Sequence, residues 1–121
     1  MLIALLALLT ATDARSILYG AWEGESICTN VRPACHNEHA VYHIAASEKP
    51  DKVAMTMNKV VDGKEEEMGT LVYRVNPTAT TLTSEYRGLV WSFTRLGTRM
   101  QGTAKQLPNG AVIRNIRLEK R

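Results

Sequence analysis

Turn-forming residues divide the chain from Gly20 onward into short segments rich in β-branched and aromatic residues. The turns include Asp62-Gly63, Leu96-Gly97 and Leu107-Pro108-Asn109-Gly110. Glycine and asparagine tolerate the positive φ that tight turns need, and the proline ring holds φ at a negative value typical of turns. Helical periodicity is not seen after the first residues of the chain. The pattern predicts eight strands, at residues 20–28, 38–47, 52–61, 66–75, 80–87, 89–94, 99–106 and 111–119.

The short links between these segments restrict how the strands can be arranged. Links of a few residues join antiparallel neighbours, so the strands are predicted to form an up-and-down meander. Such a meander either stays an open sheet or closes so that the last strand pairs with the first, and closure removes the exposed edges. We therefore predict an all-β fold, an eight-stranded antiparallel barrel that is either filled with side chains or holds one small ligand.

The first 14 residues differ from the rest of the chain. An apolar run from Leu2 to Ala11 is too short to span a bilayer and is followed directly by polar residues. This pattern predicts a signal-peptide-like leader at residues 1–14 and a single β-barrel domain at residues 15–121. The protein is then expected to be an exported monomer, periplasmic or extracellular, with no stable membrane insertion after leader removal. The alternative is a short N-terminal helix packed on the domain.

The two cysteines, Cys28 and Cys35, enclose six residues. In an exported protein, so close a pair predicts one disulfide that pins the loop after the first strand. Two cysteines alone do not make a zinc site. The chain-entropy model gives about 2–3 kcal/mol for so short a loop, so the expected contribution of the disulfide is local rigidity.

Basic residues gather in the last strands. From residue 87 to residue 121 there are eight Lys or Arg residues against a single acidic one, Glu119. Such a face suits an acidic protein partner, lipid headgroups or nucleic acid, or it simply remains solvated. No nucleic-acid-binding motif occurs in the sequence, so nucleic acid is not an expected partner.

The sequence Gly20-Ala21-Trp22 on a first strand, the strand count and an arginine on the last strand together resemble the calycin group, which includes lipocalins, fatty-acid-binding proteins and avidins. The resemblance implies that Trp22 packs at the closed end of the barrel with an arginine of the last strand across it. Arg114 is the candidate for the interior, and Arg117 is the candidate for closing the barrel on Trp22. The wider sequence pattern also resembles small exported bacterial proteins of no assigned function, which implies no activity.

The barrel interior is the candidate ligand site. Apolar walls with one or two polar anchors suit a small molecule, and an inward arginine suits a carboxylate. The expected function is non-catalytic binding of a small apolar or amphipathic ligand. The alternative is a filled barrel that acts as an envelope protein–protein interaction module, for example a protease inhibitor, through its basic face. The predicted ligand-binding residues are Trp22, Tyr86, Trp91, Phe93 and Arg114.

Other chemistry finds little support in the sequence. His39 and His43 follow the second cysteine, but on a strand they share a face about 13 Å apart, too far to hold one ion. Neither a nucleophile elbow nor a glycine-rich phosphate loop is present. We therefore expect no metal, no cofactor and no enzymatic activity.

Overall fold

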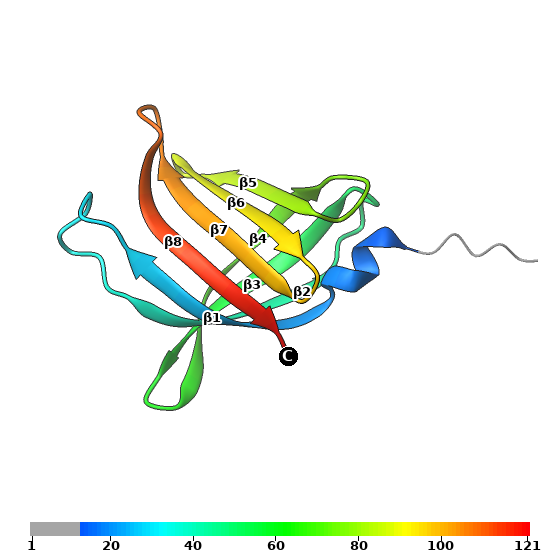
Figure 1. Ribbon diagram of the computed structural model, residues 1–121, viewed down its shortest axis with the longest axis horizontal. Coiled ribbons are helices and arrows are strands. Elements are labelled where there is room, and N and C mark those ends of the chain that lie inside the picture. Colours follow the sequence, from blue (N-terminus) through cyan, green and yellow to red (C-terminus); the bar gives the residue numbers. More distant parts are fainter. Residues whose placement is uncertain (1–12) are drawn as a thin grey trace, which may run out of the picture.

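Residues 13–121, which the computed structural model describes, form a closed antiparallel β-barrel of eight strands in chain order (Figure 1). Each strand pairs with the next, and the last pairs with the first. The all-β fold and the closed meander predicted from the turns are confirmed. The strands are β1 Gly20–Cys28, β2 Glu38–Ala46, β3 Lys52–Val61, β4 Lys64–Val75, β5 Thr81–Tyr86, β6 Leu89–Leu96, β7 Arg99–Gln106 and β8 Ala111–Lys120.

The barrel closes where β1 and β8 pair from Trp22 opposite Lys120 to Cys28 opposite Arg114. Gly24 makes this contact possible. A Cβ on Gly24 would lie 1.8 Å from the backbone oxygen of Arg117, so any larger residue would force the two strands apart. Glycine is therefore required at this point because of the close approach of two backbones.

The β3–β4 hairpin turns at Asp62-Gly63, as predicted, and both residues have positive φ, 52° and 76°. Toward the tip of the hairpin, the register between β3 and β4 shifts by one residue, because Met57 faces Gly69 whereas Asn58 faces Glu67. The extra residue produces a bulge, which bends a strand and increases its twist. Figure 1 shows the tip of this hairpin standing away from the barrel, at the bottom of the view.

One end of the barrel is closed by the 3₁₀ helix η1, Ala14–Leu18. Leu18 is fully buried within the core. The Arg15 guanidinium holds η1 to the β2–β3 turn by donating to the backbone oxygens of Ser47, Lys49 and Lys52, at 3.1, 2.9 and 2.7 Å. Residues 1–12 of the predicted leader lie outside the described residues. The apolar run Leu2–Ala11 falls among these residues, so both interpretations of it, a leader and a packed helix, stay predictions.

The inner faces of all the strands meet in one apolar core. Alternation places every second side chain inside, as the pattern of each strand predicts. No helix within residues 13–121 has the length and hydropathy needed to cross a membrane. The largest fully buried side chains are Trp22, Tyr42, Tyr73, Phe93, Leu18, Met55, Leu82, Met100, Ile116, Leu118, Val41 and Val53.

Candidate functional site

Trp22 lies at the closed end of the barrel, where the resemblance places it. Its indole is fully buried, and Nε1 donates to the backbone oxygen of Leu18 at 2.8 Å. The residue across the ring is Lys120, whose Nζ lies 5.8 Å from the ring centroid and donates to the backbone oxygen of Ile17. The predicted closure by Arg117 is wrong. Arg117 points outward and is exposed, because it alternates with the inward Leu118.

Aromatic rings occupy the middle of the barrel. Phe93 is 1% exposed and meets the rings of Tyr42 and Tyr73 edge-on, with centroid distances of 6.3 and 5.8 Å. The hydroxyl of Tyr73 donates to the sulfur of Met57. Burial raises the pKa of Tyr42 to about 12 and raises that of Tyr73 further, so both phenols stay neutral. These rings occupy the space in which the sequence placed a ligand.

Arg114 points into the barrel, as predicted, but at the end opposite Trp22. It lies six residues from the Lys120 position on β8, which is about 20 Å along a strand. Its Nη1 donates to the buried Ser26 hydroxyl at 3.1 Å, and its Nη2 lies 3.4 Å from a carboxylate oxygen of Glu38. Both charged side chains are only about one-sixth exposed, at 15% and 16%.

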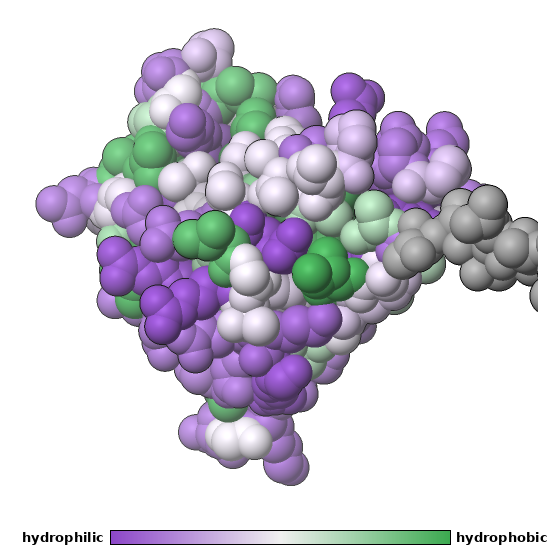
Figure 2. All heavy atoms as spheres, turned by 45° about the vertical axis from the view of Figure 1, so that its right-hand side comes forward, coloured by the Kyte–Doolittle hydropathy of each residue, from purple (hydrophilic) through white to green (hydrophobic). Residues whose placement is uncertain are grey.

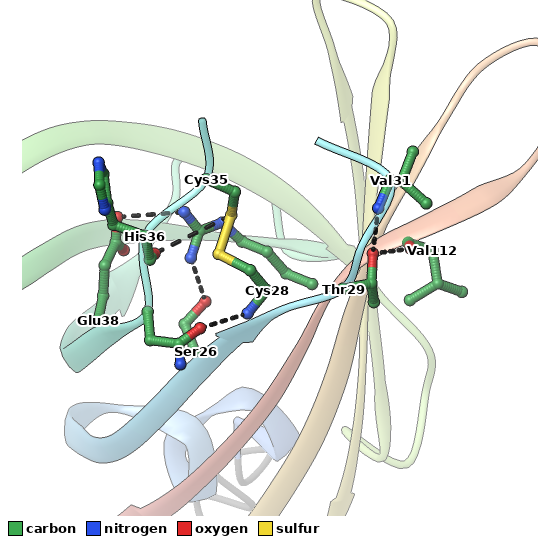
Figure 3. The surroundings of a disulfide bond; sticks show 10 residues. Ser26, Cys28, Thr29, Val31, Cys35, His36, Glu38 and Val112 are labelled. Carbon is green, nitrogen blue, oxygen red and sulfur yellow. Dashed lines mark hydrogen bonds and ion pairs between the residues drawn. A yellow bond between two sulfur atoms is a disulfide. The ribbon is translucent and has the colours of Figure 1, made fainter. Parts of the chain in front are cut away.

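The predicted disulfide between Cys28 and Cys35 is confirmed, and it covers this polar cluster (Figure 3). Asn37 also fixes the loop, because its Oδ1 accepts from the Cys28 backbone N–H at 2.8 Å. Figure 3 shows Ser26 and Glu38 next to the disulfide. Arg114 therefore lies beneath the cystine loop at the open end, the end of the barrel opposite η1.

Two of the aromatic residues predicted to line the interior, Tyr86 and Trp91, are more exposed to solvent than Trp22 and Phe93. Tyr86 is 50% exposed, so its placement in the interior wall is corrected. The reason is that β5 ends at Tyr86, whose ring stacks beneath the Arg87 guanidinium at the following turn, 5.2 Å from ring centroid to Cζ. Trp91 is partly buried and packs against the core. Whether Trp22, Tyr86, Trp91, Phe93 and Arg114 bind a ligand stays a prediction.

Two open hollows lie on the outer wall rather than inside the barrel. One, of about 640 Å³, lies over β1, β2, β7 and β8, and the other, of about 900 Å³, lies over β1 and β6–β8. Both are lined by Glu25, Gln101 and Arg117, so they adjoin each other along β8. The face of the molecule drawn in Figure 2 is mainly polar, with apolar side chains in separate groups. The two hollows therefore present polar and apolar groups together on one wall.

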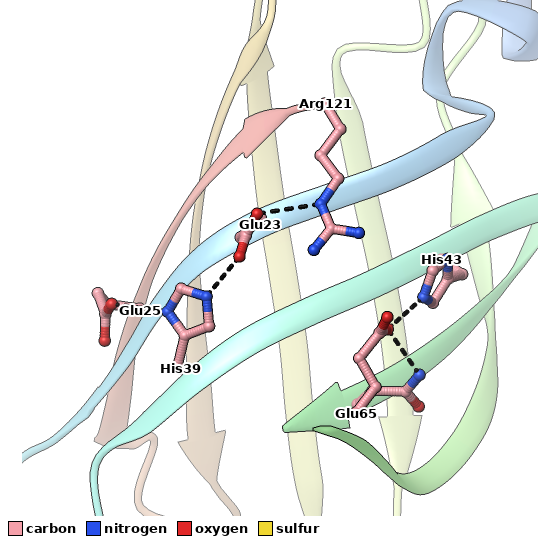
Figure 4. Close-up of polar contacts among 7 residues, drawn as sticks. Glu23, Glu25, His39, His43, Glu65 and Arg121 are labelled. Carbon is pink, nitrogen blue, oxygen red and sulfur yellow. Dashed lines mark hydrogen bonds and ion pairs between the residues drawn. The ribbon is translucent and has the colours of Figure 1, made fainter. Parts of the chain in front are cut away.

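The first hollow contains a charged cluster that the sequence analysis did not identify (Figure 4). The His39 ring lies between two carboxylates, with Nδ1 3.0 Å from Glu25 and Nε2 bonded to Glu23. Because both ring nitrogens face carboxylates, both donate and the imidazolium is favoured; bonds to Glu25 and Glu23 raise the pKa of His39. Arg121 bonds the other oxygen of Glu23 at 3.0 Å, and Arg121 and His39 lower the pKa of Glu23 to about 2.

A second contact between a histidine and a glutamate extends this cluster onto the β3–β4 hairpin. His43 and Asn58 both bond Oε1 of Glu65. Val41 lies between the two histidines on the outward side of β2 and is nevertheless 0% exposed. The cluster therefore covers an apolar residue as well as pairing charges. Alternation alone places these side chains outside, but only the register of β1, β2 and the bulged β4 brings them together.

The described residues contain no group of three or more His, Cys, Asp or Glu side chains arranged to hold a metal ion. His39 and His43, considered for such a site from the sequence, each face glutamates instead. The polar clusters therefore hold charges in pairs and networks.

Neither a protein-family model nor a curated protein matches this sequence. The closed eight-stranded antiparallel meander is consistent with a calycin-like fold. The Cys28–Cys35 disulfide is compatible with an exported protein.

Proposed function

We propose that this protein is an exported, monomeric, non-catalytic calycin-like barrel that binds a protein partner through the outer wall of β7, β8 and β1. The observation that carries the proposal is the contrast between a barrel centre filled by Phe93, Tyr42 and Tyr73 and an outer wall with two adjoining hollows. Side chains that fill a small barrel leave its surface as the place to bind.

Two exposed arginines support an acidic partner on this wall. Arg117 lies in both hollows, is exposed and has no ion pair within residues 13–121, whereas Arg99 pairs only loosely with Glu119 at 3.5 Å. Exposed, weakly paired arginines keep their donors available for carboxylates of a partner. Amide and hydroxyl groups beside them, including that of Gln101, suit the polar rim of a protein interface.

Site-specific photo-crosslinking tests this proposal. A photoreactive residue at Gln101, on the proposed wall, is expected to give one discrete adduct in envelope extracts, and Val72 on β4 serves as the control position on another part of the barrel. Arg117→Glu is expected to abolish the adduct, whereas Arg74→Glu, also on β4, leaves it. Equal adducts from both positions, or none at Gln101, would refute the proposal.

A second candidate function rests on Arg114. Its inward position beneath the cystine loop supports binding of a small amphipathic ligand whose carboxylate meets the guanidinium at the open end. The partly buried Trp91 lies in the same row of the barrel, because Trp91 faces Ala104 and Ala104 faces Arg114. Delipidated protein is then expected to bind a fluorescent fatty acid at micromolar concentration, and Arg114→Ala to weaken binding about tenfold. If the wild type takes up no fatty acid, this second function is excluded and the outer-wall proposal is unaffected.

A further inference from the structure

Three turns meet at the open end. They are the β5–β6 turn, the β7–β8 turn and the cystine loop between β1 and β2. The Leu107 backbone N–H donates to the Gly88 oxygen at 2.8 Å, which joins the β7–β8 turn to the β5–β6 turn. The Arg32 side chain donates to Oε1 of Gln106 at 3.0 Å, which joins the cystine loop to the same turn. Figure 1 shows the β5–β6 and β7–β8 turns side by side at the top of the view. The three turns therefore form one continuous edge.

This edge exposes apolar side chains in a basic setting. Val31, Tyr86 and Leu107 are 44%, 50% and 41% exposed, one from each turn region. Arg87 stacks on the Tyr86 ring, and Arg32 lies next to Val31 in the cystine loop. Residues 29–37, 86–89 and 106–110 contain these two arginines and no aspartate or glutamate. We name Val31, Arg32, Tyr86, Arg87 and Leu107 the docking rim.

The acidic part of the open end lies elsewhere. The fourth turn, Asp62-Gly63, is followed by three glutamates and stands away from the barrel on the opposite side of the view (Figure 1). Most of the acidic charge at this end thus lies on the hairpin, and the exposed Glu85, directly before Tyr86, is the acidic residue next to the docking rim. A flat anionic surface can approach the docking rim while the acidic hairpin projects elsewhere.

We infer that the docking rim binds the surface of a membrane that contains anionic lipids. Tyrosine and aliphatic side chains at loop tips enter the headgroup boundary, where tyrosine places its ring in the apolar layer and its hydroxyl in water. Arg32 and Arg87 remain at the level of the phosphates and pair with them. The docking rim combines three exposed apolar residues with two arginines and contains no acidic residue. Because these side chains stand on the tips of three turns of one barrel, they can reach an anionic lipid surface at the same time, and they fit it better than they fit an acidic protein.

Vesicle flotation tests this inference with the full chain. Wild type is expected to float with vesicles of phosphatidylglycerol and phosphatidylcholine but not with phosphatidylcholine alone, and binding is expected to fall as salt rises. The pair Tyr86→Ser and Leu107→Ser is expected to weaken partition about tenfold. The pair Arg32→Gln and Arg87→Gln is expected to weaken it more than tenfold, at about fivefold for each arginine.

Leu96→Ser and Arg74→Gln provide the matched control. Leu96 is 83% exposed at the β6–β7 turn, at the η1 end of the barrel, so this pair removes the same kinds of group from the other end. It is expected to leave flotation unchanged. Failure of the wild type to float, or equal loss in the control pair, would overturn the inference. Neither result affects the crosslink at Gln101, which lies on the outer wall.

Discussion

His39 shows how one side chain can make the stability of this barrel depend on pH. Its two ring nitrogens bond Glu25 and Glu23, and these bonds raise its pKa above the ordinary value of about 6.5. A raised pKa in the folded state means that the stabilisation is fully present below about pH 6.5 and is lost as the pH rises through the folded-state pKa. We expect His39→Gln to lower the urea midpoint at about pH 5.5 and to have little effect at about pH 9.

His36→Gln is the matched control, because His36 is exposed on the cystine loop and has no ion pair within the described residues. Its urea midpoint should follow that of the wild type at every pH. The stability that the glutamate of the same cluster contributes changes with pH in the opposite direction. The pKa of Glu23 is lowered to about 2, first by Arg121, so its contribution is present above about pH 4.5 and is lost as the pH falls toward 2. A pH-independent effect of His39→Gln would contradict the ionised cluster.

At the scale of the strand, closure depends on the absence of a side chain at Gly24. Gly24→Ala would place a methyl group 1.8 Å from the Arg117 backbone oxygen, and backbone cannot move aside as a flexible side chain can. We expect a loss of about 3 kcal/mol or more in unfolding free energy, with the fastest amide exchange in β1 and β8. Urea denaturation and hydrogen exchange measure the two effects. Ala21→Ser, outward on the same strand, should change stability by less than about 0.5 kcal/mol.

The cystine loop is the second element whose contribution can be isolated. Cys28 and Cys35 are seven positions apart, and removing their bond frees the loop in the unfolded chain. We expect the double variant Cys28→Ser, Cys35→Ser to lose about 2–3 kcal/mol of unfolding free energy while its far-ultraviolet circular dichroism stays that of the barrel. Asn37 still accepts from the Cys28 backbone, so amide protection should fall mainly within residues 29–36. Loss of the whole barrel would show that its stability, and not only the order of the loop, depends on the disulfide.

For the whole molecule, the strand pattern was predictable because each turn carries its own chemistry. The positive φ at Asp62 and Gly63 is a local requirement. The position of Trp22 was implied by the resemblance that its strand carries. The residue across Trp22 was not predictable, because Lys120, rather than an arginine, reaches it only in the final β1–β8 register. The outer hollows and the His39 cluster likewise combine strands far apart in sequence, and alternation gives the face of a residue but not its neighbour.

The filled interior also lay beyond the sequence, since alternation shows which side chains point inward and not whether they leave a cavity. The filling of the barrel centre depends on Phe93, because its ring contacts Tyr42 on the opposite wall and Tyr73 two strands away. Phe93→Ala is expected to cost about 3–5 kcal/mol and to open an apolar cavity that binds benzene or xenon, as buried apolar cavities do. Wild type should take up neither. Ligand-induced chemical-shift changes at Tyr42 and Tyr73 report the binding.

Phe93→Leu guards against the possibility that the alanine variant does not fold, since it keeps most of the packing and leaves a smaller space. A graded response is expected, with benzene shifting the thermal midpoint upward most in Phe93→Ala, less in Phe93→Leu and not in the wild type. The order follows from volume, because each carbon removed from a packed centre leaves room that the surrounding strands fill only in part. A wild type that binds benzene as well as the variants do would mean that the barrel already holds a cavity, and the interior, rather than the wall of β7, β8 and β1, would become the favoured binding site.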